Sequence, residues 1–177
     1  MLSYCLDCAA KNRSCCGNVN IYLTLADVER IASCGVVEDF YSLEPLTAEY
    51  LDGGGDPNWN ALILDESGRR RVVRQKPDGN CVFLSDTGCR LASDKRPLLC
   101  RIFPFEFLGE KIIGISDYCP VSAVDNWQEV LNESEMNTES SLKWIKQLYR
   151  EIYQEKNPSE IAAVEDKSVC KCRSKKV

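Results

Sequence analysis

The chain has 177 residues, a charged fraction of 28% and a net charge of −5. The length fits one domain of roughly 100–200 residues, and the acidic balance excludes the broad basic surfaces that nucleic acids and membranes favour. Two counts are unusual: eleven cysteines and no histidine. The lack of histidine excludes every catalytic scheme and every metal site that depends on an imidazole.

The N-terminal segment has neither the basic region nor the apolar region of a secretory signal. No apolar run approaches the roughly 18 residues of a membrane span. We therefore expect a cytoplasmic protein with reduced thiols. Clustered cysteines in that compartment more often bind metals or carry out redox chemistry than form disulfides.

The first part of the chain predicts short elements around a polar, cysteine-dense loop at residues 1–20. Thr24 and Asp27 form a capping-box-like start for a helix, and Gly35 is a plausible stop for it. Periodicity and turn residues then predict, in order, helices at 37–43 and 47–51 and a β-hairpin that joins 61–64 to 71–74.

The second part predicts two more hairpins, 81–84 with 88–91 and 106–108 with 111–115, and a helical turn opened by Pro97. Beyond Pro120, apolar residues recur at helical spacing in two stretches. We therefore expect an α+β fold with a small, irregular, cysteine-rich metal-binding core, short β-hairpins and peripheral helices. Its parts would be a metal-binding domain (1–120), a helical hairpin packed on it (121–165) and a basic tail (166–177).

The spacing of the cysteines is the strongest functional signal. Cys5 and Cys8 form a C-x2-C pair, which places two thiolates on one tight turn. Cys15 and Cys16 are adjacent, so they either bind different metals or are brought to one metal by a sharply folded loop. Four further thiols follow at wider spacing: Cys81, Cys89, Cys100 and Cys119. These eight thiols could fill two four-coordinate sites, or one cluster with thiols to spare.

Basic residues accompany the clustered cysteines in this otherwise acidic chain. Thiolate sites carry net negative charge, which proteins offset with cations and N–H donors directed at sulfur. Arg96 and Arg101 flank Cys100, and we expect them to support the bound group. Ordinary solvated surface explains Lys11, Arg13 and Lys95 equally well.

Two blocks of the sequence carry a family pattern. The first is Cys5-Leu-Asp-Cys8 with Cys15-Cys16-Gly17; the second contains Cys81, Cys89, Arg96-Pro97-Leu-Leu-Cys100-Arg101-Ile-Phe103-Pro104-Phe105 and Cys119-Pro120. Together they resemble the YkgJ-type cysteine-cluster family, also described as the CxxCxxCC zinc- or iron-chelating domain, over about residues 5–120. The resemblance implies that the metal ligands are Cys5, Cys8, Cys15, Cys16, Cys81, Cys89, Cys100 and Cys119. A related segment in flagellin lysine methylase is linked to an iron–sulfur cluster.

These features predict a thiolate metal-binding protein that holds an iron–sulfur cluster, with [4Fe–4S] favoured, in a redox or enzyme-supporting role. Two alternatives stay open: a structural zinc module that mediates protein interaction, and a component of a protein-modifying enzyme. Whether the chain is itself an enzyme also stays open. The expected partner is a protein, and neither nucleic acid nor a membrane is expected.

Three cysteines and one tryptophan lie outside the predicted ligand set. Cys34 ends a predicted helix and is expected to be a small buried side chain and no ligand. Cys170 and Cys172 lie in the basic tail, as an extra ligand pair or as two exposed thiols. Trp144 lies about 90° from the apolar stripe of its helix, so either an interface or ordinary burial can explain it.

Overall fold

The computed structural model describes residues 15–17, 19–35, 39–47, 58–133 and 136–157. Within these ranges it has five α-helices and three separate two-stranded antiparallel sheets, so the predicted α+β class is confirmed. None of the described helices has the length and apolar character needed to cross a membrane.

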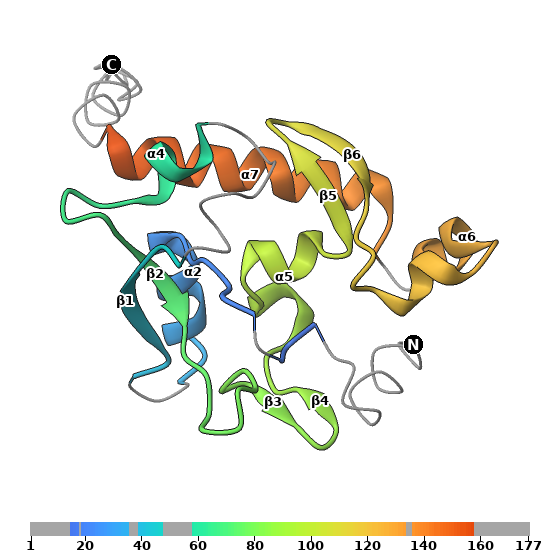
Figure 1. Cartoon of the computed structure of the whole chain (residues 1–177), viewed down its shortest axis with the longest axis horizontal. Coiled ribbons are helices and arrows are strands. Elements are labelled where there is room, and N and C mark those ends of the chain that lie inside the picture. Colours follow the sequence, from blue (N-terminus) through green and yellow to red (C-terminus); the bar gives the residue numbers. More distant parts are fainter. Residues whose placement is uncertain (1–14, 18, 36–38, 48–57, 134–135, 158–177) are drawn as a thin grey trace, which may run out of the picture.

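Figure 1 shows α7 along one end of the molecule, the β3–β4 hairpin at the opposite end, and α5 between them. The elements are α2 (Leu25–Ala32), β1 (Tyr41–Pro45), α4 (Trp59–Ile63), β2 (Arg69–Val73), β3 (Leu84–Ser85), β4 (Gly88–Cys89), α5 (Leu98–Ile102), β5 (Phe105–Leu108), β6 (Lys111–Ile115), α6 (Trp127–Glu133) and α7 (Thr138–Lys156).

Helix α2 begins as the sequence predicts. The Thr24 hydroxyl accepts a hydrogen bond from the Asp27 N–H at 2.9 Å, and the Asp27 carboxylate accepts one from the Thr24 N–H at 3.3 Å. This reciprocal capping satisfies two N–H groups at the helix start. Gly35 follows the helix with φ of +67°, a conformation that glycine adopts without steric cost.

Two predictions in the first part are wrong. Residues 41–45 form strand β1 rather than part of a helix, and 59–63 form helix α4 rather than a strand. Strand β2 therefore pairs with β1, with Tyr41 opposite Val73, and not with residues 61–64. The reason is tertiary contact: Trp59 and Ile63 lie one helical turn apart and pack on α7 and its neighbours. The predicted helix at 47–51 lies, apart from Thr47, outside the described residues.

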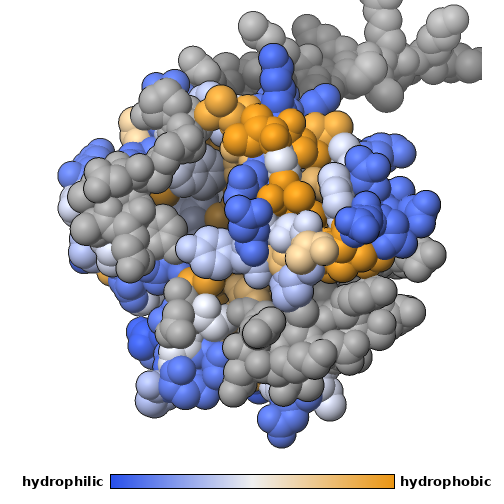
Figure 2. Space-filling model, turned by 45° about the vertical axis from the view of Figure 1, so that its right-hand side comes forward, coloured by the Kyte–Doolittle hydropathy of each residue, from blue (hydrophilic) through white to orange (hydrophobic). Residues whose placement is uncertain are grey.

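The hairpins further along agree better with the sequence. Strands β3 and β4 pair through Leu84 and Cys89, and β5 and β6 pair around Gly109. Gly109 has φ of +56°, which explains why glycine occupies that turn. A two-stranded sheet can bury only one face against the core. Leu108 and Ile113 accordingly remain exposed, and Figure 2 shows apolar surface, interrupted by polar groups, on the side of the molecule that carries this hairpin.

The apolar interior is divided into two clusters. The first, here called the α7 core, surrounds Ile145, Leu148 and Ile152 and includes Leu98 and Ile102 of α5. The second, here called the thiol core, contains four of the cysteines together with apolar residues such as Phe83 and Leu91. Leu99 packs against both clusters. Helix α5 is therefore the element that joins them.

Buried polar groups connect α2 to α7. The Thr24 hydroxyl donates to the Glu151 carboxylate at 2.5 Å, and Arg30 donates to the same carboxylate at 3.1 Å. Arg30 also pairs with Asp27 at 2.5 Å. Asp27 and Glu151 are both buried, so their charges are satisfied inside the protein and not by water.

Candidate metal centre

Four of the predicted ligands come together in the thiol core: Cys16, Cys81, Cys89 and Cys100. After burial, which is the main cause, thiolates at Cys16, Cys81 and Cys89 raise the pKa of the Cys100 thiol. Burial also raises the pKa of the Cys81 thiol, and thiolates at Cys16 and Cys89 raise it further. Such mutual effects require proximity, so the fold gathers residues from three distant parts of the sequence into one group.

Local backbone structure places each of these thiols. The Cys81 N–H donates to the Cys16 carbonyl at 2.7 Å, and a β-bridge joins Gly17 to Asn80, so the two segments run side by side. Cys89 ends strand β4 of the short hairpin. Cys100 lies on α5. The described part of the site is thus assembled from a turn, a hairpin and one short helix.

Backbone N–H groups point at two of the sulfurs. The Phe83 N–H donates to Cys81 Sγ at 3.4 Å. Burial raises the pKa of Cys89, and a backbone hydrogen bond from Leu91 opposes that rise. In both cases the donor follows the cysteine by two residues. Donors of this kind stabilise negative sulfur and tune a bound metal.

The electrostatics of the group favour a cationic guest. Burial raises the pKa of Cys81 to about 11, and burial raises the pKa of Cys100 well above its ordinary value. Cys16 differs, because a hydrogen bond from the Cys15 thiol lowers its pKa to about 7, against burial and with help from Arg96. Buried thiols that resist ionisation become thiolates when a metal cation supplies the compensating charge.

The two predicted supporting arginines have different surroundings. Arg96 hydrogen-bonds the Cys89 side chain, and its Nε donates to the Leu91 carbonyl at 3.2 Å. The guanidinium of Arg101 lies 4.7 Å from the centre of the Trp144 ring on α7. Arg96 therefore lies at the thiols, whereas Arg101 contacts the helical side. Trp144 is partly buried against the α7 core.

The other predicted ligands are placed less completely. Cys15 is exposed, and its thiol is hydrogen-bonded to the Cys16 thiol. Cys119 is buried in the α7 core, with its N–H donating to the Ser116 carbonyl at 3.0 Å. Cys5, Cys8, Cys170 and Cys172 lie outside the described residues. The expectation of a buried Cys34 is wrong: its side chain is exposed at the end of α2, where Sγ donates to the Arg30 carbonyl at 3.5 Å.

The gathered thiols do not form a complete site for one ion. In the described part of the chain, no three cysteine or carboxylate side chains are arranged so that they could hold one metal ion. The four thiols of the group nevertheless lie near enough to affect one another's pKa.

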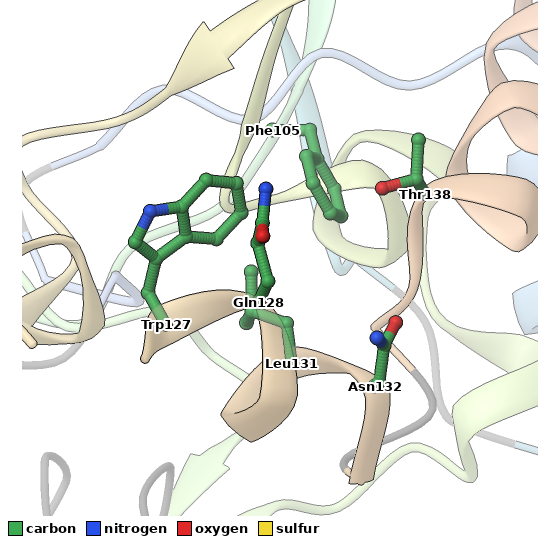
Figure 3. Close-up of a pocket in the computed structure, with 6 residues that line it drawn as sticks. All are labelled: Phe105, Trp127, Gln128, Leu131, Asn132 and Thr138. Atoms are coloured by element: carbon green, nitrogen blue, oxygen red, sulfur yellow. The ribbon is translucent and has the colours of Figure 1, made fainter. Parts of the chain in front are cut away.

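A small pocket of about 140 Å³ is formed by β5, α6 and the start of α7. Figure 3 shows the six residues that line it. Its lining is aromatic, aliphatic and amide, with no thiol or charged group: Phe105, Trp127, Gln128, Leu131, Asn132 and Thr138. The pocket is therefore separate from the cysteine group.

A family model matches residues 4–120, with the description "CxxCxxCC: Putative zinc- or iron-chelating domain". The chain belongs to the CxxCxxCC family. The match contains all eight predicted ligand positions and ends at Pro120, so the resemblance drawn from the two sequence blocks is confirmed. Comparisons with curated proteins and with solved structures find no match. CxxCxxCC membership makes this chain a metal-binding protein of the zinc- or iron-chelating kind.

Sequence reasoning missed one residue that positions the CxxCxxCC site. Asp27 accepts a hydrogen bond from the Leu98 N–H at 3.1 Å, across 71 residues of sequence. Pro97, the residue before α5, supplies no capping side chain of its own, so Asp27 takes that role and fixes the helix that carries Cys100. The pattern Thr24-x-x-Asp27 indicated a local capping box, and nothing in it indicated a second acceptor role.

Proposed function

We propose that this CxxCxxCC protein holds an iron–sulfur cluster, with [4Fe–4S] favoured, and serves in a redox or enzyme-supporting role. Cys16, Cys81, Cys89 and Cys100 are the ligands proposed for it. The observation that carries the proposal is that these four thiols gather in one apolar cluster, with backbone N–H donors at two of the sulfurs.

Four cysteines are the usual ligand set of an iron–sulfur cluster. The chain contains no histidine that could complete a mixed zinc site.

The surroundings of the thiols support the same conclusion. Cys81 and Cys89 receive backbone N–H groups, and Phe83 and Leu91 are buried beside them. Hydrogen bonds to sulfur and exclusion of solvent are the means by which proteins set the reduction potential of a cluster. Arg96 adds a positive charge next to Cys89 and Cys16.

The remaining four predicted ligands are proposed for a second centre. Eight cysteines provide two sets of four, and the first set is filled by the gathered group. Cys5, Cys8, Cys15 and Cys119 would form the second set, which fits the position of Cys119 in the α7 core and not in the thiol core.

Anaerobic purification followed by metal, sulfide and absorption analysis tests the proposal. An iron–sulfur protein should be brown, contain iron and acid-labile sulfide in similar amounts, and bleach on reduction. Cys16→Ser and Cys89→Ser should each remove iron, because serine is a harder and far less acidic ligand. A colourless protein that carries stoichiometric zinc and no sulfide would contradict the proposal and leave the structural zinc module in its place.

A further inference from the structure

Charge is distributed unevenly along this acidic chain. Residues 69–101, which carry Cys81, Cys89 and Cys100, contain nine basic and three acidic residues, whereas residues 102–157 contain five basic and ten acidic residues. Residues 76–101, which hold Cys81, Cys89 and Cys100, contain five of these basic residues and all three acidic ones, so the segment keeps a modest positive excess in a chain of net charge −5. Local potentials of this kind steer the approach of charged partners.

Three of these cations are held around the β3–β4 hairpin by backbone carbonyls. Lys76 Nζ donates to the Leu84 carbonyl at 2.6 Å, and Arg90 Nη2 donates to the Val82 carbonyl at 2.9 Å. Arg96 is held at the Leu91 carbonyl. These three residues are called the basic rim here. Because Leu84 pairs with Cys89, the basic rim surrounds the Cys89 side of the thiol group.

The charges of the basic rim are available to a partner. Within the residues described by the structure, Lys76, Arg90 and Arg96 form no ion pair with a carboxylate, in contrast to Arg74, which pairs with Asp39 at 2.7 Å. A lysine carries three N–H donors and an arginine five, so each keeps donors beyond its carbonyl contact. Arg90 is exposed, and Cys89 beside it is only half-buried.

Arg96 alone of the three bonds a thiol, as expected of a residue that offsets thiolate charge. The hydrogen bonds of Lys76 and Arg90 go to main-chain oxygens instead. Those contacts fix the direction of the two side chains without an ion pair to a carboxylate in the described residues, although the charge of Lys76 is felt by the nearby Asp78. Oriented cations beside a half-buried ligand form a docking surface more readily than a structural support.

We propose that the basic rim docks a protein with an acidic face, over the Cys89 side of the proposed metal centre. The inference rests on the proposed function in placing a metal centre beneath this surface. It names the chemistry of the partner: carboxylates that pair with Lys76 and Arg90. Figure 1 places the β3–β4 hairpin at the end of the molecule away from α7, where a second protein can approach it without meeting that helix.

The overall charge favours a protein over a nucleic acid. A polyanion of uniform charge would be repelled by the acidic remainder of the chain, whose segment 102–157 carries twice as many acidic as basic residues. A folded protein with a local acidic patch meets only the basic rim. Complementary charge of this kind mainly sets partner choice and association rate.

Binding of a short fluorescent hexaglutamate peptide to the metal-loaded protein tests the docking surface. The experiment compares wild type, the double variant Lys76→Gln/Arg90→Gln and the control Lys146→Gln/Arg150→Gln, which removes two exposed charges from α7. We expect the first variant to bind about 5- to 10-fold more weakly at low ionic strength, the scale of two surface ion pairs. The control should bind like wild type, and all affinities should fall at about 0.15 M salt.

Three results would overturn the docking surface. Equal affinity of the two double variants would remove the special role of Lys76 and Arg90. Tighter binding of a single-stranded oligonucleotide of equal charge would identify a nucleic-acid surface. Loss of metal from Lys76→Gln/Arg90→Gln would make the two residues supports of the centre.

The same measurements separate this inference from the proposed function. A zinc-loaded, colourless protein whose Lys76→Gln/Arg90→Gln variant loses hexaglutamate binding would contradict the iron–sulfur assignment and keep the docking surface. A brown, iron-loaded protein whose variant binds hexaglutamate like wild type would keep the iron–sulfur assignment and contradict the docking surface.

Discussion

The α7 core and the thiol core are stabilised in different ways. The α7 core has a 19-residue helix that buries Ile145, Leu148 and Ile152 at 1% exposure or less, so apolar burial alone can support it. The thiol core has two-residue strands and buried thiols whose pKa values are raised by burial. We therefore expect its stability to depend in part on a bound metal, in addition to the burial of apolar side chains such as Leu23, Ile31 and Phe83. The contrast predicts that one half of the protein is self-sufficient and that the other half is stabilised by its ligand.

Metal removal should produce the largest difference between the two cores. We expect an apparent loss of stability on the order of 10 kcal/mol, the scale of structural metal sites, and we expect the loss to be local. Hydrogen exchange on holo and chelated protein should show protection lost at residues 81–91 and kept in α7. Equal protection in both states, or equal melting temperatures, would mean that the thiol core stands without metal.

Replacement of single cysteines should sharpen the contrast. Cys100→Ser should abolish metal binding at the gathered group, because Cys100 interacts with all three other thiols of the group. Cys34→Ser is the matched control: its thiol is exposed at the end of α2. Metal analysis of both variants checks the expectation. Metal loss from Cys34→Ser would show that the ligand set extends beyond the eight predicted cysteines.

A cavity in the α7 core should affect stability without affecting metal. Leu148 is fully buried, so Leu148→Ala should cost about 2–5 kcal/mol. Metal content per folded molecule should remain that of wild type, as measured by elemental analysis of the purified fold. If instead metal content falls with stability, the two cores form one cooperative unit.

Loss of a buried proton-binding group should give a smaller, pH-dependent effect. Burial raises the pKa of Asp27 above its ordinary value of 3.8, so the folded state holds this proton more tightly than the unfolded state. The contribution of Asp27 to stability is therefore greatest at low pH and declines as pH rises through the interval up to its raised pKa.

The comparison with Asp27→Asn isolates this effect. The difference in unfolding free energy between wild type and variant, measured by urea titration at equal metal content, should shrink as pH rises from about 4. A difference that grows with pH would mean that the folded state binds the Asp27 proton more weakly than the unfolded state, contrary to the effect of burial.

The smallest effect is expected at Arg101, which follows Cys100 but contacts α7. Arg101→Lys replaces a planar group over Trp144 by a compact ammonium and should cost about 0.5–1 kcal/mol. Metal content should stay unchanged, since Arg101 serves the α7 side. Arg150→Lys, at an exposed position of α7, is the control. Metal loss in Arg101→Lys alone would restore its predicted role at the thiols.

Local signals were sufficient to predict several elements. Helix α2 follows from its capping box, and the β5–β6 hairpin follows from Gly109 between alternating apolar residues. Predictions failed where distant contacts decide the structure: Trp59 and Ile63 are helical because they pack on α7, and β2 pairs with a strand that the local pattern indicated as helix. Propensity is a weak guide in such short segments.

The sequence predicts which cysteines are candidate ligands but not how the fold groups them. The family resemblance implies eight ligands, and four of these, Cys16, Cys81, Cys89 and Cys100, gather in the thiol core; their binding of a metal stays a prediction. The division between those four and Cys119 depends on which side of α5 each thiol lies, and the three-dimensional fold alone sets that. The carbonyl contacts of Lys76 and Arg90 were equally invisible, because main-chain acceptors leave no mark on the sequence.

The cap that Asp27 places on α5 has a consequence for the order of events during synthesis. A five-residue helix does not persist alone, and Asp27 is itself tied to Arg30 and, through it, to Glu151. The Thr24–Glu151 hydrogen bond spans 127 residues, and contacts at such separation form late. We therefore expect Cys100 to reach its final position only after residue 151 has left the ribosome, so that whatever delivers the metal meets a nearly complete chain.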